Sequence, residues 1–283
     1  MAWTERQHRL LAAMGLRLLS PPAAEGASPA QLPVAEPAPA PVAPPAVTAA
    51  AVDVAVSAAV PAAADRRAPT PPAEAPGARP GSAAAALSAL GWPELREAVA
   101  ACRACGLCER RTQTVFGVGS TQAQWMVVGE APGEQEDREG EPFVGAAGQL
   151  LDRMLAALQL TRAQEPGTPP ERQVYIANTL KCRPPGNRNP APDELARCEP
   201  FLVRQIELLK PRIILAMGRF AVQALLRSDE PIGRLRGRVH RYQGVPLVVT
   251  YHPAYLLRNL PEKAKAWDDL CLAAEVFERP PAG

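Results

Sequence analysis

The clearest pattern in the sequence is a series of short apolar runs that alternate with segments of helical spacing. The runs lie at residues 125–129, 174–177, 212–217 and 246–251. The helical segments lie at residues 147–158, 193–209 and 219–226, and a further helix opens at Trp92 and Pro93. Short runs rich in Val and Ile between helices are typical of a buried parallel sheet. We therefore predict an α/β fold with three α/β/α layers around a central four-stranded, mainly parallel sheet.

The segment over residues 20–85 has a different composition. It holds 15 of the 33 prolines, many alanines and no Phe, Trp or Tyr. Proline interrupts helices, and a segment without aromatic residues buries too little apolar surface to offset its chain entropy. We therefore predict a disordered Pro/Ala-rich linker over 20–85, a folded domain over 86–279 and a short amphipathic helix over 1–19.

In that first segment, apolar residues recur at helical spacing at Leu10, Leu11, Met14 and Leu18. A helix this short is marginal alone in water, so we expect it to dock, either on its own folded domain or on a partner protein. The segment is similar to the N-terminal peptide of the clamp-loader psi subunit, which would make the partner a replication or repair protein.

The charge of the chain is nearly balanced, with 31 Lys and Arg against 29 Asp and Glu. This balance excludes a global polycation, so nucleic-acid contacts must come from a local patch. A predicted hairpin carries one basic cluster, either a phosphate track or a solvated face, at Arg234, Arg236, Arg238, His240 and Arg241. The sequence has no apolar run of 18 residues and no clear secretion signal, so we expect a cytoplasmic protein, in the bacterial cytosol, without a membrane span.

The cysteines are the first candidate chemistry. Cys102 and Cys105 form a C-x-x-C pair, and Cys182 and Cys198 follow the second predicted strand. Without a secretion signal, metal or cluster ligation is a better interpretation than disulfides. Four thiolates can hold an iron–sulfur cluster or a zinc ion, and the residues alone leave both open. Cys108 is either a further ligand or a spare thiol.

Polar and glycine-rich motifs follow three of the predicted strands. They are GEAPGEQED at 129–137 with PFVGAAGQLL at 142–151, IANTLKCRPPGNRNP at 176–190, and YHPAYLLR at 251–258. The carboxyl ends of parallel strands meet at one edge of a sheet, where ligands bind. Gly129 permits close approach of a ligand, and Phe143 can form the wall of a flat pocket. Asn178 supplies an amide with a donor and an acceptor, and His252 supplies a hydrogen-bonding ring.

Together these motifs closely resemble the family 4 uracil-DNA glycosylases, the iron–sulfur branch of the uracil-DNA glycosylase superfamily. The similarity covers residues 95–272 and rests on four motifs in the family's order, GEAPG, PFVGxAG, KCRPPxNR and HPAYLLR. It implies an enzyme that flips uracil out of single- or double-stranded DNA and hydrolyses its N-glycosidic bond. It also implies a [4Fe–4S] cluster held by Cys102, Cys105, Cys182 and Cys198.

The resemblance further implies roles in a uracil pocket. Phe143 would stack on the base, Asn178 would pair with its O4 and N3–H edge, and His252 would hydrogen-bond O2. Gly129 and Ala131 would line the substrate site. Ala131 stands where the best-known branch of the superfamily has an Asp that activates water.

Because that Asp is missing, the resemblance leaves the position of the attacking water open. The water would be held by backbone groups, by Glu136, or by Asn187 or Asn189. Glu130 would shape its loop or contact the sugar and phosphate of the DNA.

The segment after His252 would bind DNA. Leu256 and Leu257 would insert from an exposed loop into the vacated base stack, and Arg258 would contact phosphate. We expect a monomer that acts on uracil-containing DNA. The alternatives are a relative that acts on other deaminated bases, and a non-catalytic DNA-binding or replication-docking protein.

Overall fold

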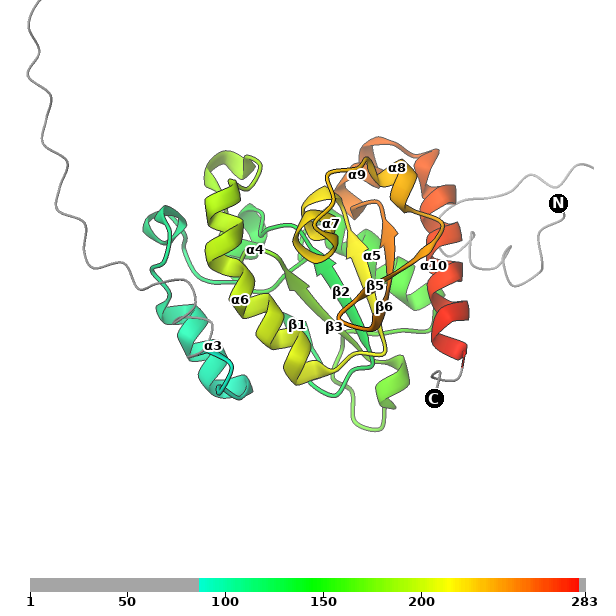
Figure 1. The fold of residues 1–283 in the computed structure, drawn as a ribbon, viewed down its shortest axis with the longest axis horizontal. Helices are drawn as coiled ribbons and strands as arrows, with labels where there is room; N and C mark the ends of the chain where they lie inside the picture. Colours follow the sequence, from blue (N-terminus) through cyan, green and yellow to red (C-terminus); the bar gives the residue numbers. More distant parts are fainter. Residues whose placement is uncertain (1–86, 280–283) are drawn as a thin grey trace, which may run out of the picture. The chain divides into compact units, whose positions relative to one another are not determined.

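The computed structural model describes residues 87–279 (Figure 1). The helix predicted over 1–19 and the linker predicted over 20–85 lie outside the described residues. The strands are β1 (Val118–Gly119), β2 (Trp125–Gly129), β3 (Val174–Asn178), β4 (Ile213–Met217), β5 (Val239–Tyr242) and β6 (Val245–Thr250). They form one sheet in the order β1-β3-β2-β4-β6-β5.

The centre of this sheet is parallel. Strands β3, β2, β4 and β6 pair in parallel, as predicted from the four apolar runs. The sheet is larger than the predicted four strands, because β1 and β5 add an antiparallel pairing at each edge. Neither edge strand forms an apolar run: β1 has two residues, and β5 has no buried residue.

Helices cover both faces of the sheet and confirm the predicted three layers (Figure 1). The helices within residues 87–279 are α3 (Trp92–Ala101), α4 (Glu134–Glu139), α5 (Ala146–Ala157), α6 (Pro192–Leu209), α7 (Arg219–Leu226), α8 (Ile232–Leu235), α9 (Pro253–Arg258) and α10 (Glu262–Glu278). Short 3-10 turns lie at Gly106–Glu109, Pro170–Arg172 and Pro185–Asn187.

The strand residues alternate between two hydrophobic cores. Val127 of β2 belongs to the core formed with α5, α9 and α10, which includes the fully buried Trp267. Val128 belongs to the core formed with α6 and α7. Burying a side chain of this size stabilises the fold by about 1.5–3 kcal/mol. Both faces of the central strands are covered, which explains their continuous apolar sequence.

A third, smaller core attaches the start of the domain to the sheet. Pro93 lies in the first turn of α3, where its missing N–H leaves no helical hydrogen bond unmade. Leu95 and Val99 are buried on one face of this helix and pack with Phe116 and Phe201. The cysteine-bearing segment that follows α3 is thereby held against α6.

The parallel strands end at one edge of the sheet. Gly129 at the end of β2 is paired with Asn178 at the end of β3, and Met217 of β4 is paired with Thr250 of β6. The segments that leave these strands therefore converge. None of the helices described in residues 87–279 is long and apolar enough to cross a membrane.

Candidate functional site

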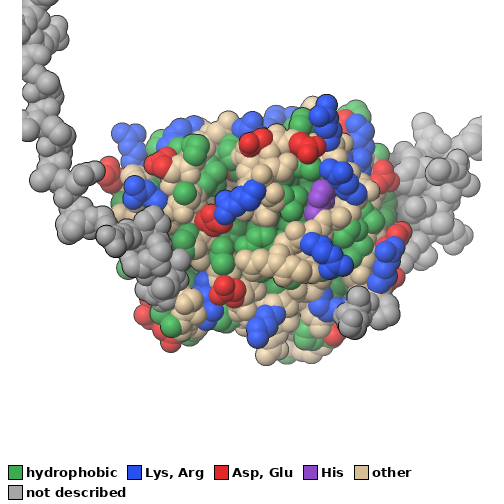
Figure 2. Space-filling model, in the orientation of Figure 1, with side chains coloured by type: hydrophobic (Ala, Val, Ile, Leu, Met, Phe, Trp, Pro, Cys, Tyr) green, Lys and Arg blue, Asp and Glu red, His purple; other side chains and the backbone are tan. Residues whose placement is uncertain are grey.

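An open cleft of about 710 Å³ lies where these strands end. It brings together most of the residues predicted for the site, namely Glu130, Ala131, Glu136, Phe143, Asn178, Asn187, Asn189, His252 and Arg258. Basic and acidic side chains are interspersed on the face of the molecule shown in Figure 2, as the nearly neutral charge predicts. The surface shown there is therefore mixed in charge, without one large region of a single sign.

Asn178 lies at the inner end of the cleft. Only 2% of this residue is exposed, and its Oδ1 is buried without a hydrogen-bond partner. A Cβ atom at Gly129 would lie 2.4 Å from that Oδ1 and 2.7 Å from the Phe143 ring, so glycine alone allows the amide and the ring to approach so closely. An unpaired buried amide costs about 1–3 kcal/mol, which a ligand that pairs with it would recover.

Phe143 is held beside Asn178 in a constrained conformation. Its φ is +57°, and Arg162 donates hydrogen bonds of 2.8 Å to the carbonyl oxygens of Pro142 and Phe143. A Cβ at Gly148 would meet the Phe143 carbonyl oxygen at 1.7 Å, so glycine is required there as well. A left-handed conformation at an aromatic residue is strained, and such strain is typical of a functional position.

His252 follows β6 and caps the start of α9. Its Nδ1 accepts a hydrogen bond of 3.2 Å from the Ala254 N–H, so the proton of the neutral ring is on Nε2. Burial lowers the pKa of His252 to about 4; the charge of Glu136 opposes the shift and that of Arg258 adds to it. The ring stacks on Phe143, with centroids 5.3 Å apart and planes at 29°. A neutral imidazole that donates from Nε2 is therefore fixed beside an aromatic wall.

Glu136 is occupied by its own loop. Its Oε2 accepts from the Gly133 N–H at 3.0 Å, and its Oε1 accepts from the N–H groups of Val144 at 3.2 Å and Gly145 at 3.4 Å. The carboxylate therefore ties the start of α4 to the loop that carries Phe143. These three bonds make it a poor candidate for the base that activates water.

Glu130 and Asn187 also line the cleft. Burial raises the pKa of the Glu130 carboxyl, and the charge of Arg219 acts in the opposite direction. Asn187 has a φ of +55°, and its Oδ1 accepts a hydrogen bond of 2.8 Å from Arg183 Nε. Ala131 lines the same wall and brings no carboxylate to it.

The segment after His252 differs from the prediction of an exposed loop. Residues Pro253–Arg258 form helix α9, and Leu256 is fully buried in the core. The role predicted for Leu256 in the DNA stack is therefore wrong, because its side chain packs inside the protein. Leu257 is 41% exposed and Tyr255 is 37% exposed, so these are the apolar side chains that α9 presents outward.

Part of the predicted basic cluster has a structural role. Arg236 Nε donates to Asp269 Oδ2 at 3.0 Å, and Asp269 is fully buried. His240 Nε2 hydrogen-bonds the Leu235 carbonyl oxygen at 2.7 Å. The contacts of these two side chains tie the segment before β6 to the domain, so an interpretation of the whole cluster as a phosphate track is too broad.

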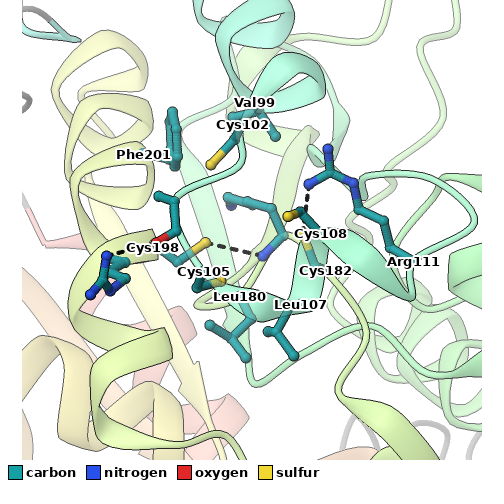
Figure 3. Close-up of a pocket in the computed structure, with 13 residues that line it drawn as sticks. Val99, Cys102, Cys105, Leu107, Cys108, Arg111, Leu180, Cys182, Cys198 and Phe201 are labelled. Carbon is teal, nitrogen blue, oxygen red and sulfur yellow. Dashed lines mark hydrogen bonds between the residues drawn. The ribbon is translucent and has the colours of Figure 1, made fainter. Parts of the chain in front are cut away.

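Five cysteines line one small cavity between α3, the turn at Gly106–Glu109 and α6 (Figure 3). They are the four predicted ligands and Cys108; the others lining it include Val99, Leu107, Leu180 and Phe201.

Two of these thiols accept hydrogen bonds: Arg111 Nη1 donates to Cys182 Sγ at 3.1 Å, and the Lys181 N–H donates to Cys198 Sγ at 3.3 Å. Burial raises the pKa of the Cys198 thiol to about 12, which the charge of Lys181 opposes. Within residues 87–279, no three His, Cys, Asp or Glu side chains are arranged to hold a single metal ion.

Sequence reasoning missed Lys181, which lies between the two regions. Only 1% of this lysine is exposed, and it is among the largest fully buried side chains of the domain. Lysine is almost never fully buried without a partner, so its burial indicates a specific role. Its place after an apolar strand and next to Cys182 is the only sequence signal for that burial.

Comparison with known proteins gives consistent matches. The family model of the Uracil DNA glycosylase superfamily matches residues 116–271. The chain is 43% identical over 167 residues to a type-4 uracil-DNA glycosylase of Archaeoglobus fulgidus, which covers 56% of this chain and 79% of that relative. It is 42% identical over 165 residues to a type-4 uracil-DNA glycosylase of Thermotoga maritima, covering 58% and 81%. A type-5 uracil-DNA glycosylase of Pyrobaculum aerophilum is 33% identical over 150 residues, covering 50% and 66%.

Proposed function

Because the chain belongs to the uracil-DNA glycosylase superfamily and to its type-4 branch, we propose that it excises uracil from DNA. It hydrolyses the N-glycosidic bond between uracil and deoxyribose, which leaves an abasic site and begins base-excision repair. The observation that carries this proposal is the unpaired, buried Oδ1 of Asn178, next to the stacked rings of Phe143 and His252.

Asn178 is suited to read the base. Its Oδ1 accepts from uracil N3–H, and its Nδ2 donates to uracil O4. Cytosine presents a donor and an acceptor in the reverse order, so both contacts would be repulsive and two buried groups would stay unpaired. Phe143, which Gly129 allows to approach the amide, supplies the flat wall on which the base stacks.

His252 is suited to stabilise the leaving base. When the glycosidic bond breaks, the electron pair goes to uracil and negative charge gathers at O2. The Nε2–H of a neutral, preoriented imidazole donates to that oxygen, and one such donor typically lowers the barrier by about 3 kcal/mol. Its depressed pKa keeps the ring neutral at pH 7, so it stabilises the anion by hydrogen bonding.

The remaining polar groups of the cleft serve the water and the sugar. We assign Glu136 to holding the Phe143 loop, because its carboxylate accepts three backbone N–H groups. Glu130 and Asn187 line the cleft and are assigned to contacts with water or deoxyribose. Neither residue occupies the position of the water-activating Asp, where this chain has Ala131.

DNA binding uses the rim of the cleft. Arg188, Arg219 and Arg258 line it and supply positive charge for backbone phosphates. Leu257, exposed on α9, is the residue that fills the stack once uracil has been flipped out, which costs a few kcal/mol. The Ala254–Arg258 segment thus keeps its proposed DNA role, with Leu257 in place of Leu256.

We propose that Cys102, Cys105, Cys182 and Cys198 hold a [4Fe–4S] cluster. Support comes from the donor set: these thiols line one mostly apolar cavity, and two of them accept N–H hydrogen bonds, a frequent feature around cluster sulfurs. The bound cluster would supply a structural tie between the segment after α3 and the segment after β3. The membership of the chain in the type-4 branch, which the resemblance describes as the iron–sulfur branch, favours a cluster over zinc.

The proposed function is tested with oligonucleotides that carry one uracil, hypoxanthine or mispaired thymine, single- and double-stranded, cleaved with alkali after incubation. We expect strand scission at uracil in both forms. No scission at uracil would contradict the proposal, and preferred scission at hypoxanthine would favour a relative that acts on other deaminated bases. The type-4 and type-5 relatives are all named uracil-DNA glycosylases, which favours uracil as the substrate base.

A further inference from the structure

Lys181 links the cleft to the cysteine cavity. It follows Asn178 by three residues along the chain and directly precedes Cys182. Its side chain runs back under the end of β3, where Nζ donates to the Asn178 carbonyl oxygen at 2.9 Å. The same Nζ donates to Gln205 Oε1 at 2.6 Å. A buried lysine therefore holds the backbone of the residue that the proposed function assigns to reading uracil.

Gln205 anchors this lysine from α6. The glutamine is itself fully buried, and its Nε2 donates to the Phe116 carbonyl oxygen at 2.9 Å and to the Tyr175 hydroxyl at 3.1 Å. Lys181 Nζ makes two hydrogen bonds in this network, and the Gln205 amide makes three. Lys181 Nζ consequently has one position relative to the strand end, and the Asn178 carbonyl is held there with it.

The other end of Lys181 faces the sulfurs. Its backbone N–H donates to Cys198 Sγ at 3.3 Å, and its carbonyl oxygen accepts from the Val115 N–H at 2.8 Å. Among residues 87–279 no carboxylate forms an ion pair with Lys181, and its Nζ is held by two neutral acceptors, the Asn178 carbonyl oxygen and Gln205 Oε1. A buried polar group is costly unless it is hydrogen-bonded, so these two contacts fix the side chain.

We infer that Lys181 is a positioning residue for base recognition: it fixes the backbone carbonyl of Asn178 and connects that residue to the cysteine cavity. The inference rests on the proposed function and adds a residue to it. Lys181 does not touch the base. It acts by keeping the Asn178 amide in the orientation that pairs with uracil, so its loss weakens base-dependent binding and leaves contacts to the DNA backbone unchanged.

The test compares Lys181→Met with Lys210→Met in the full-length protein. Lys210 is exposed at the end of α6, just before β4 begins, whereas the cleft lies where the parallel strands end. Its variant therefore controls for the loss of one positive charge. The probes are DNA with 2′-fluoro-deoxyuridine, which resists cleavage, the same DNA with 2′-fluoro-deoxycytidine, and product DNA with an abasic site. Iron content and visible absorption are measured on each protein.

We expect Lys181→Met to keep its iron and its affinity for abasic DNA, and to bind the fluorouridine probe at least ~10-fold more weakly. Lys210→Met should match the wild-type protein. Unchanged preference for fluorouridine over fluorocytidine in an iron-loaded Lys181→Met protein would overturn the inference. If the wild-type protein does not distinguish these two probes, the proposed function itself fails.

Gln205→Met provides the second variant if Lys181→Met does not fold. It removes one of the two acceptors of Nζ and leaves the contact to Asn178 in place. We expect a smaller, roughly 3-fold loss of fluorouridine binding with unchanged binding of abasic DNA. Equal affinity of this variant and the wild-type protein for the fluorouridine probe would overturn the inference.

Discussion

The cleft and the cysteine cavity lie on either side of the same strand end, and they differ in how their polar atoms are satisfied. In the cleft, Asn178 Oδ1 is buried and unpaired, and the cleft that the residue lines is open to solvent. In the cavity, Cys182 and Cys198 already accept hydrogen bonds from the protein, and the lining is mostly apolar. A site for a ligand that enters and leaves keeps its bonding capacity free. A site for a permanent group has its supporting contacts built in.

The largest effect is expected from removing a thiol of the cavity. Cys198→Ser should lose its iron and its brown colour, because the serine hydroxyl is a poor replacement for a thiolate at a buried ligand position. Iron analysis and visible absorption of the purified proteins measure this directly. Cys108→Ser is the matched variant in the same cavity, and Cys271→Ser, in α10, controls for loss of a cysteine elsewhere.

We expect Cys108→Ser and Cys271→Ser to keep iron at the wild-type level. Full iron content in Cys198→Ser, or its loss in Cys108→Ser, would contradict the proposed ligand set and remove the contrast between the two regions.

The next effect concerns the chemistry in the cleft. His252→Ala removes the donor to uracil O2 and should lower the single-turnover rate of excision about 10²- to 10³-fold. Affinity for DNA with an abasic site should change little, because the product lacks the base that His252 contacts. A rate within a few-fold of the wild-type protein would exclude His252 as the group that stabilises the leaving base.

A smaller effect distinguishes the two leucines of α9. Leu256→Ala should lower the free energy of unfolding by about 2–5 kcal/mol, since it creates a cavity in the core. Leu257→Ala should leave stability within ~0.5 kcal/mol and reduce excision from double-stranded DNA more than from single-stranded DNA. Denaturant unfolding and paired activity assays check both. The reverse pattern would restore Leu256 as the inserted residue.

The smallest effect is the pH dependence of stability. The pKa of His252 is about 4 in the folded protein and about 6.5 in an unfolded chain, so only the unfolded state gains a proton as the pH falls from 7 to 5. The stabilisation is complete above pH 6.5 and is lost as the pH falls towards 4. The wild-type protein should lose on the order of 1–2 kcal/mol more than His252→Gln between pH 7 and 5, measured by denaturant unfolding. An equal loss in both proteins would show that His252 is not buried in its neutral form.

The sequence predicts the parallel centre of the fold well, because each of these strands is buried on both faces and forms a continuous apolar run. The edge strands were not counted in the predicted sheet for the opposite reason, although a hairpin was predicted over the segment that contains β5: β5 is half exposed, and β1 is only two residues long. The family resemblance is confirmed by the matches to type-4 relatives. The motifs that carry the resemblance supply residues that line the cleft at one edge of the sheet.

Side-chain orientation could not be predicted from the same motifs. Leu256 and Leu257 are adjacent in sequence, and only the helical geometry of α9 turns the first into the core and the second outward. The three backbone partners of the Glu136 carboxylate could not be inferred from the sequence either. Lys181 was overlooked because a lysine in a polar segment is ordinarily exposed.

The most direct test of base reading in the cleft exchanges the amide of Asn178 for a carboxyl group in Asn178→Asp. The ionised carboxylate only accepts hydrogen bonds, so uracil O4 would face an acceptor, whereas cytosine donates from its amino group and, once protonated at N3, from N3–H as well. Excision is measured on matched oligonucleotides with uracil or cytosine at the same position. We expect the wild-type protein to act on uracil alone, and the variant to lose on the order of 10²-fold on uracil and to gain activity on cytosine. An unchanged preference for uracil in Asn178→Asp would contradict the assignment of Asn178 as the residue that reads the base.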